Sequence, residues 1–230
     1  NYTDWVTGTR IQALANDRNL CVVMPSGDNK FYCDSALSGD KYGSFIAKDL
    51  VEFIQDTFPV SKAREDTIIG GLSMGGFGSI VNALRNPDTF GYVCALSSAL
   101  IKEGILHSVN EPGRDFFTRR QYETLFGVEK VEDYAGSEND YEALADGLKD
   151  APNKPKIYMA CGTEDGLFPA NVAFRDKLIA DGFDVTWEEG PGAHNWAFWD
   201  AYIEKALNWL PLSDAVKGVS SENVGVTDKK

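Results

Sequence analysis

The chain has 230 residues, of which 43% are apolar and 25% charged, and its formal net charge is −13. This length allows one domain with a substantial core and is too short for two comfortable ones. No apolar run approaches the length of a membrane span, and an acidic surface repels nucleic acid and anionic lipid. We therefore expect a globular protein without nucleic-acid or membrane partners, and we attribute the charge to solubility.

Predicted strands and helices alternate along most of the chain. Short apolar runs predict five buried strands, at residues 19–25, 66–71, 91–96, 156–161 and 183–187. Apolar residues at helical spacing predict four helices, at about residues 44–58, 75–86, 170–178 and 199–210. Ser44 is predicted to cap the first helix, and Gly182 to end the third. This alternation implies an α/β fold with a mostly parallel sheet, helices on both faces, and chemistry beyond the carboxyl ends of the strands.

Two segments fall outside this alternation. Residues 99–155 are polar and contain a Glu-Pro-Gly turn, so we expect an insertion of short helices that forms a small cap over the pocket. Residues 213–230 form a polar tail that we expect to be frayed. The sequence thus predicts one domain over residues 1–212.

The four cysteines do not suggest a metal site. No C-x-x-C pair is present and the chain has only two histidines, so we predict no metal and no cofactor. Cys21, Cys94 and Cys161 each lie in a predicted strand, where a free thiol packs as a small hydrophobe. Unpaired thiols favour a reducing, cytoplasmic location. The chain starts at Asn1, so an upstream signal would not be visible.

Residues 71–75, Gly-Leu-Ser-Met-Gly, match the G-x-S-x-G pattern of a nucleophile elbow. The match carries weight because it follows a predicted strand and opens a predicted helix, which puts the Ser73 hydroxyl above the sheet. We expect Gly71 and Gly75 to be required because a Cβ there would collide with neighbouring backbone. The backbone N–H of Met74 is the predicted donor to an oxyanion.

A serine nucleophile needs a base and an acid that orients it. His194 lies in a loop after a predicted strand, whereas His107 lies in the insertion and is expected to be a solvated cap residue. Asp165 also follows a strand, and we prefer it to its neighbour Glu164 because the glycine after it suits a tight loop. The chain order Ser73, Asp165, His194 is that of the α/β-hydrolases.

Around these residues the chain resembles the esterase D-like family of α/β-hydrolases. The resemblance runs from about Trp5 to Leu212 and rests on four stretches: MPSGDNKFYCDSA, GGLSMGGFGS, CGTEDGLFPAN and GAHNWAFWD. The family includes tributyrin esterases, S-formylglutathione hydrolases, and feruloyl and acetylxylan esterases, and the tributyrin and cinnamoyl esterase branch is most similar. The resemblance implies that Ser73, Asp165 and His194 form the triad and that Met74 supplies an oxyanion donor. It also suggests a homo-oligomer.

The resemblance raises two further expectations. Family members have additional strands and a His-Gly loop before the position of Asn1, so we expect a truncated chain that lacks the first oxyanion donor. The segment from Phe31 to Asp34 resembles an aromatic loop near the pocket. Phe31, Tyr32 and Trp196 are therefore candidates to line the substrate pocket, with ordinary packing as the alternative for each.

The sequence predicts a serine carboxylesterase for short-chain acyl esters, acting on small-molecule or polysaccharide-linked substrates through an acyl-enzyme. A feruloyl or acetylxylan esterase that acts on plant polysaccharide is the main alternative. An acyltransferase would use the same three residues but pass the acyl group to an alcohol. S-formylglutathione hydrolase is less favoured because no glutathione-recognition feature is evident. A non-catalytic binding module predicts a missing triad residue, and none is missing.

Overall fold

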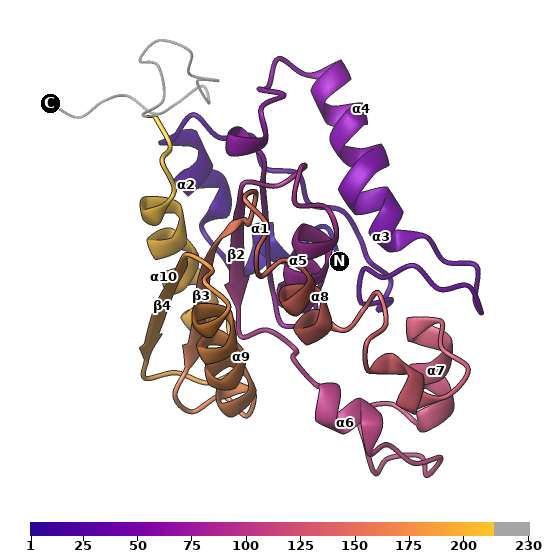
Figure 1. Cartoon of the computed structure of the whole chain (residues 1–230). Helices are drawn as coiled ribbons and strands as arrows, with labels where there is room; N and C mark the ends of the chain where they lie inside the picture. Colours follow the sequence, from indigo (N-terminus) through magenta and orange to yellow (C-terminus); the bar gives the residue numbers. More distant parts are fainter. Residues whose placement is uncertain (214–230) are drawn as a thin grey trace, which may run out of the picture.

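The computed structural model describes residues 1–213, and the predicted tail from residue 214 onward lies outside the described residues. Its centre is a sheet of four parallel strands in the order β1-β2-β3-β4 (Figure 1). The strands are β1 Ile68–Leu72, β2 Tyr92–Leu96, β3 Lys156–Gly162 and β4 Val185–Gly190. Each strand pairs with the next one along the chain, so every connection crosses over a face of the sheet.

Both faces of the sheet are buried because apolar residues occupy both alternating positions of the central strands. On β2, Val93 and Ala95 belong to one core cluster, whereas Cys94 and Leu96 belong to the other. β3 divides its side chains between the same two clusters. Strands that are apolar on both sides are typical of a parallel sheet covered by helices.

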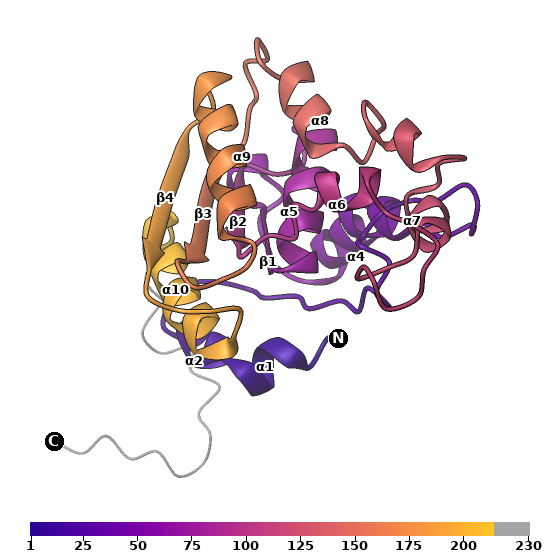
Figure 2. The same cartoon turned by 90° about the horizontal axis from the view of Figure 1, so that it is seen from below.

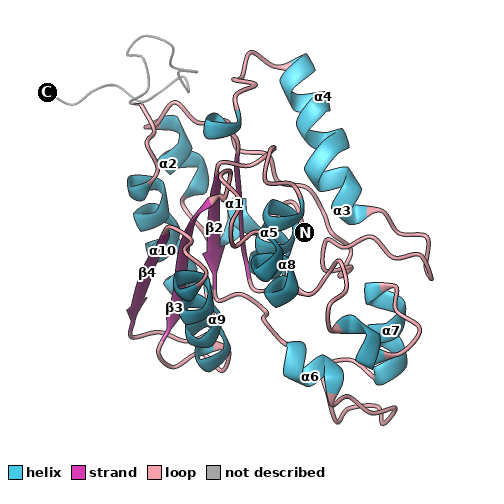
Figure 3. Ribbon diagram, in the orientation of Figure 1, coloured by secondary structure: helices cyan, strands magenta, loops and turns pink. Residues whose placement is uncertain are grey.

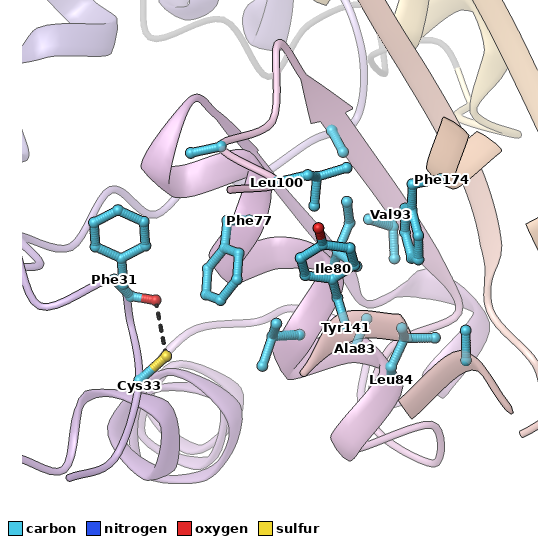
Figure 4. Packing of buried hydrophobic residues seen from close by; sticks show 14 of the residues in the cluster. Phe31, Cys33, Phe77, Ile80, Ala83, Leu84, Val93, Leu100, Tyr141 and Phe174 are labelled. Carbon is cyan, nitrogen blue, oxygen red and sulfur yellow. Dashed lines mark hydrogen bonds between the residues drawn. The ribbon is translucent and has the colours of Figure 1, made fainter. Parts of the chain in front are cut away.

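Helices cover each face. On one side lie α5 Met74–Arg85, α8 Tyr141–Gly147 and α9 Phe168–Ala180; on the other lie α2 Ile11–Asn16 and α10 Trp196–Trp209 (Figure 2). Figure 4 shows the first core, in which Phe77 and Ile80 of α5 pack with Val93 of β2 and Phe174 of α9. The structure confirms the predicted α/β architecture with helices on both faces. Gly182 has a φ of 74°, the left-handed conformation expected where α9 ends.

Short helices fill the segment between β2 and β3. They are α6 Lys102–Leu106, α7 Arg119–Phe126, the 3₁₀ turn η3 Val131–Tyr134, and α8 (Figure 3). The Lys102 ammonium donates to Asp140 at 2.8 Å and to Glu142 at 2.7 Å, which ties α6 to the start of α8. The rings of Phe126 and Tyr134 pack edge to face with their centroids 4.9 Å apart, and they extend the first core into this segment. The segment is therefore packed onto the domain by its own aromatic residues.

The first long helical stretch begins earlier than predicted. It runs through α3 Tyr42–Ser44, a π-helical turn at Phe45–Asp49, and α4 Leu50–Thr57. Ser44 lies inside the helix and is not its cap, so that prediction is wrong. Its N–H donates to Asp34 Oδ1 at 2.9 Å and its hydroxyl donates to the other carboxylate oxygen. The acceptor for this free N–H at the start of the helix is therefore the carboxylate of Asp34, ten residues earlier, and not a serine side chain next to it. Phe58 is extended, as expected before proline.

The predicted strand at residues 19–25 is also wrong. This segment pairs with no strand of the described sheet. Leu20, Val22 and Met24 pack partly buried against the second core cluster, while Cys21 is exposed. One side of this apolar run is therefore covered by the second core cluster without any backbone pairing. Cys94 and Cys161 are buried as predicted, and Cys33 is buried too.

Candidate active site

The link between β1 and α5 is a strained turn with Ser73 at its centre. Ser73 has φ 53° and ψ −117°, a conformation that residues other than glycine seldom adopt. A Cβ on Gly71 would lie 2.4 Å from the backbone carbonyl of Gly75, so glycine is required at 71. A Cβ on Gly75 would meet nothing closer than 3.9 Å, so the predicted collision there is wrong. The turn has the geometry of a nucleophile elbow.

Backbone hydrogen bonds fasten this turn to the end of β2. The Ser73 N–H donates to the Leu96 carbonyl oxygen at 2.9 Å, and the Ala99 N–H donates to the Ser73 carbonyl oxygen at 2.9 Å. A Cβ on Gly76 would lie 2.6 Å from the Ser98 hydroxyl, so glycine lets α5 start directly against this strand end. The Ser73 backbone is therefore positioned by residues 96–99.

A buried asparagine of α9 also holds this strand end. The Asn171 side chain accepts from the Ser98 N–H at 3.0 Å and donates to the Ser98 carbonyl oxygen at 2.8 Å. It is fully buried on the face of α9 that also carries Phe174 and Leu178. We did not predict this role. The available signal was a polar residue at the helical spacing of a buried face.

Ser73, His194 and Asp165 lie in one chain of hydrogen bonds. His194 Nδ1 is 2.8 Å from Asp165 Oδ2, and His194 Nε2 is 2.9 Å from the Ser73 hydroxyl oxygen. Because a carboxylate only accepts, Nδ1 carries the proton of a neutral ring, and Nε2 is left to accept from the serine. The three residues follow β1, β4 and β3, so they meet beyond the carboxyl edge of the sheet.

Burial distinguishes the partners in this chain. The Asp165 side chain is 1% exposed and its second oxygen accepts from the Leu167 N–H at 2.9 Å, whereas the His194 side chain is 37% exposed. Glu164, the alternative that we weighed, is exposed. His107 is an exposed residue at the end of α6, as predicted, with Nδ1 2.9 Å from the Glu103 carbonyl oxygen. A buried acid and an accessible base suit proton transfer at the surface of a pocket.

Trp199, which the sequence identifies only as an apolar position of a helix, is a further neighbour of His194. The two rings lie 4.8 Å apart at 90°. The indole N–H donates to the Ser97 hydroxyl at 3.1 Å. Ser97 is fully buried, follows β2, and has a φ of 44°. The strand end that positions Ser73 therefore also holds a ring that touches His194.

Met74 begins α5, and the Tyr32 ring packs against the same end of this helix. Met74 is the first residue of the helix, so its N–H has no partner within the helix. The Tyr32 ring packs against α5 where a Cβ on Gly78 would lie 2.6 Å away. Burial raises the pKa of Tyr32, and the negative charge of Asp4 adds to this. Tyr32 thus lies one helical turn from Ser73 along α5.

Phe31 and Trp196 occupy different settings. Phe31 is buried in the first core and packs 5.4 Å from Phe77 and 5.7 Å from Phe126, so its setting is that of a packing residue (Figure 4). Trp196 is half-buried at the start of α10, two residues after His194. It helps to line an open cleft of about 280 Å³, together with Thr7, Gly8, Thr9, Arg10, Ala197 and Asp200.

Within residues 1–213, no group of three or more histidine, cysteine, aspartate or glutamate side chains is arranged to hold a metal ion. Over the same part of the chain, no helix combines the length and the apolar character that crossing a membrane requires.

Comparison with known proteins gives the family. The model of the family described as "Putative esterase" matches residues 1–210. The chain belongs to this esterase family. An acetyl esterase of Caldicellulosiruptor saccharolyticus is 39% identical to it over 211 residues, which cover 91% of this chain and 79% of that relative. The resemblance predicted from the sequence is therefore confirmed.

Two solved structures from Staphylococcus aureus are similar to this esterase. They are the fluorophosphonate-binding serine hydrolase FphF, with a TM-score of 0.78, and the S-formylglutathione hydrolase FrmB, with a TM-score of 0.76. Each is 31% identical, and each similarity covers 90% of this chain and 78% of the other. This esterase is thus an α/β-hydrolase and a carboxylic ester hydrolase.

Proposed function

We propose that this esterase hydrolyses short-chain acyl esters, acetyl esters in particular, with Ser73 as nucleophile, His194 as base and Asp165 as its orienting acid. The observation that carries the proposal is the unbroken hydrogen-bond chain from the Ser73 hydroxyl through both nitrogens of His194 to the buried Asp165. The acyl preference is supported by the relative named acetyl esterase, which is 39% identical.

In the proposed reaction His194 Nε2 takes the proton of Ser73 as its oxygen attacks the ester carbonyl. Asp165 stabilises the resulting imidazolium through Nδ1–H. The tetrahedral intermediate collapses when His194 gives its proton to the departing alcohol, which leaves an acyl group on Ser73. Water, deprotonated by the same base, then releases the acid and restores the serine.

The developing oxyanion needs hydrogen-bond donors. We propose the Met74 N–H as one of them, because it is the first N–H of α5 and has no acceptor within that helix. The partial positive charge at the start of a twelve-residue helix adds to its effect. One such donor is worth about a hundredfold or more in rate.

Trp196 is the residue that we propose to contact the alcohol part of the ester. It lines the cleft between α10 and the Thr7–Arg10 segment, and it follows His194 by two residues. The cap formed by residues 99–155 is proposed to bound the other side of the pocket. Its Phe117 contributes an aromatic ring that contacts Phe31 at 6.2 Å.

The test compares p-nitrophenyl acetate, p-nitrophenyl butyrate and methyl ferulate as substrates of the parent and of Ser73→Ala. We expect the acetate ester to have the highest kcat/KM and the variant to be inactive on all three. A preference for methyl ferulate would favour the feruloyl esterase alternative. Product formed with added alcohol instead of water would favour an acyltransferase. A folded parent that is inactive on every ester would contradict the proposal.

A further inference from the structure

We infer that the pair Ser97–Trp199 has a positioning role: it holds the His194 ring in the orientation that lets Nε2 accept from the Ser73 hydroxyl. This inference rests on the proposed function, since it assumes that His194 is the base. Trp199 touches no atom that reacts, and it acts through the histidine ring. Without a lateral support, that ring is restrained by the Asp165 hydrogen bond and by its own loop.

The first observation is the contact itself. The edge-to-face arrangement of His194 and Trp199, at 4.8 Å and 90°, leaves the histidine little room to rotate about its Cβ–Cγ bond. His194 is partly open to solvent on its other sides, with 37% of its side chain exposed. Trp199 is only 6% exposed, so its ring is held more firmly than the His194 ring and can support it.

The second observation is that Trp199 is itself fixed to the strand end that holds the nucleophile. Its N–H donates to Ser97 Oγ at 3.1 Å, and Ser97 immediately follows Leu96, whose carbonyl oxygen accepts from the Ser73 N–H. The end of β2 therefore holds both the nucleophile and the ring that supports the base. A shift of about 1 Å between such groups can cost about a hundredfold in rate.

The third observation is the strain at Ser97. Its φ of 44° is unfavourable for a residue with a Cβ, and the residue is fully buried. Positions of this kind persist only where the surrounding contacts determine them. The conformation aims the Ser97 hydroxyl at the indole of α10, and the Cys161 sulfur lies 3.9 Å from the same oxygen. This contact explains why a serine occupies a strained site.

Trp199→Phe tests the role, with Trp209→Phe as the matched control. Both residues lie on α10 and pack against aromatic rings, but Trp209 is ten residues farther along, about 15 Å away, and contacts Tyr92 and Tyr158. We expect Trp199→Phe to lower kcat for p-nitrophenyl acetate about tenfold with KM changed less than twofold. Its rate of inactivation by a fluorophosphonate should fall by the same factor. Trp209→Phe should change neither rate more than twofold.

Ser97→Ala is an independent test, because it removes the hydrogen bond to Trp199 and keeps the indole ring. We expect it to reproduce the loss in kcat, and the double variant Ser97→Ala/Trp199→Phe to lose no more than either single variant, because both remove one interaction. The downfield proton signal of His194 Nδ1–H should broaden in Trp199→Phe and stay sharp in Trp209→Phe. Rates equal to those of the control, a change confined to KM, or additive losses would overturn the inference. An inactive parent would instead refute the proposed function.

Discussion

The carboxyl edge of the sheet and the loop of residues 27–34, which we name the aromatic loop, lie beside the same helix but are built differently. The edge holds Ser73 by hydrogen bonds from β2 and places Asp165 and His194 in loops that follow strands. The aromatic loop has four residues with positive φ: Asp28, Asn29, Phe31 and Tyr32. The edge is determined by the sheet, whereas the aromatic loop depends on contacts with distant residues, such as the Gly78 backbone beside Tyr32.

This difference has a functional meaning. Polar groups at the edge are paired at 2.8–2.9 Å and their removal should affect the reaction first. The aromatic loop is held by ring packing and by the Asn82 amide, which donates to the Tyr32 carbonyl oxygen at 3.0 Å. Changes there should affect folding stability first.

Asp165→Asn should lower kcat by about 10⁴-fold, because an amide in this place stabilises the wrong tautomer of His194 and no imidazolium. The free energy of unfolding should change far less than the rate, since the amide fits the same buried space. Steady-state kinetics and urea unfolding of the same preparation measure both quantities. Glu164→Gln, at the exposed neighbour, is the control and should retain the parental rate. An active Asp165→Asn enzyme would contradict the assignment of the acid.

Asn171→Ala should lower both stability and rate, because it leaves the N–H of Ser98 buried without a partner. The Ser98 carbonyl oxygen loses one of its two donors and keeps the Leu100 N–H at 2.8 Å. An unpaired buried group of this kind costs about 1–3 kcal/mol, so we expect a loss of that size in the free energy of unfolding. The strand end that carries Ser73 then loses its support, and kcat should fall at temperatures where the variant is still folded. Parental kcat in a destabilised variant would show that the asparagine serves folding alone.

Gly78→Ala tests the aromatic loop. The new Cβ would lie 2.6 Å from the Tyr32 ring, and such overpacking costs about 1–3 kcal/mol. Gly104→Ala is the matched control: it also lies in a helix, but nothing is within 4 Å of its Cβ. That substitution should stabilise the protein by about 0.5–1 kcal/mol. Thermal unfolding of the two variants should therefore shift in opposite directions, and equal shifts would refute the close packing of Tyr32.

These regions also differed in how well the sequence predicted them. The placement of Ser73, Asp165 and His194 at one edge of the sheet could be predicted because each follows a strand that has its own local sequence pattern. The residue that accepts from the first N–H groups of the helix after the aromatic loop could not be predicted. Ser44 is a good local candidate, but the acceptor is Asp34, ten residues earlier in the chain. Asn171 and the Ser97–Trp199 pair escaped prediction because their contacts join segments about 70 to 100 residues apart.

The predicted strand at residues 19–25 illustrates the same limit. An apolar run shows that residues are buried on at least one side, but it does not show whether a neighbouring strand is available. Leu20, Val22 and Met24 pack on the second core cluster without pairing, and Cys21 faces solvent. Whether such a segment forms a strand therefore also depends on whether a free strand edge lies beside it.

Thiol labelling gives the smallest and most local test. Burial raises the pKa of Cys161 to about 12 and raises that of Cys33 as well, so both stay protonated and unreactive in the folded enzyme at pH 8. A thiol reagent should modify exposed Cys21 at once and the buried thiols only through local opening. Because the aromatic loop is strained, Cys33 should react before Cys161. The opposite order, read by peptide mass spectrometry, would contradict the contrast between the two regions.

The same pKa shifts give a direction for stability against pH. A buried thiol whose pKa is raised above its unfolded value remains protonated in the folded enzyme while the unfolded chain loses its proton. The stabilisation is complete below the unfolded pKa of about 8.5 and is lost as the pH rises toward 12. Urea midpoints should therefore fall through this alkaline window. Replacing Cys94 by Ala should make that fall shallower.

Trapping the acyl-enzyme identifies the nucleophile itself. The protein is mixed with p-nitrophenyl acetate, quenched in acid within the first turnovers, digested, and mapped by mass spectrometry. We predict one acetyl group on the peptide that contains Ser73, and none on that peptide in Ser73→Ala. An acetyl group on another residue, or turnover by Ser73→Ala at the parental rate, would contradict the assignment of Ser73 as the nucleophile.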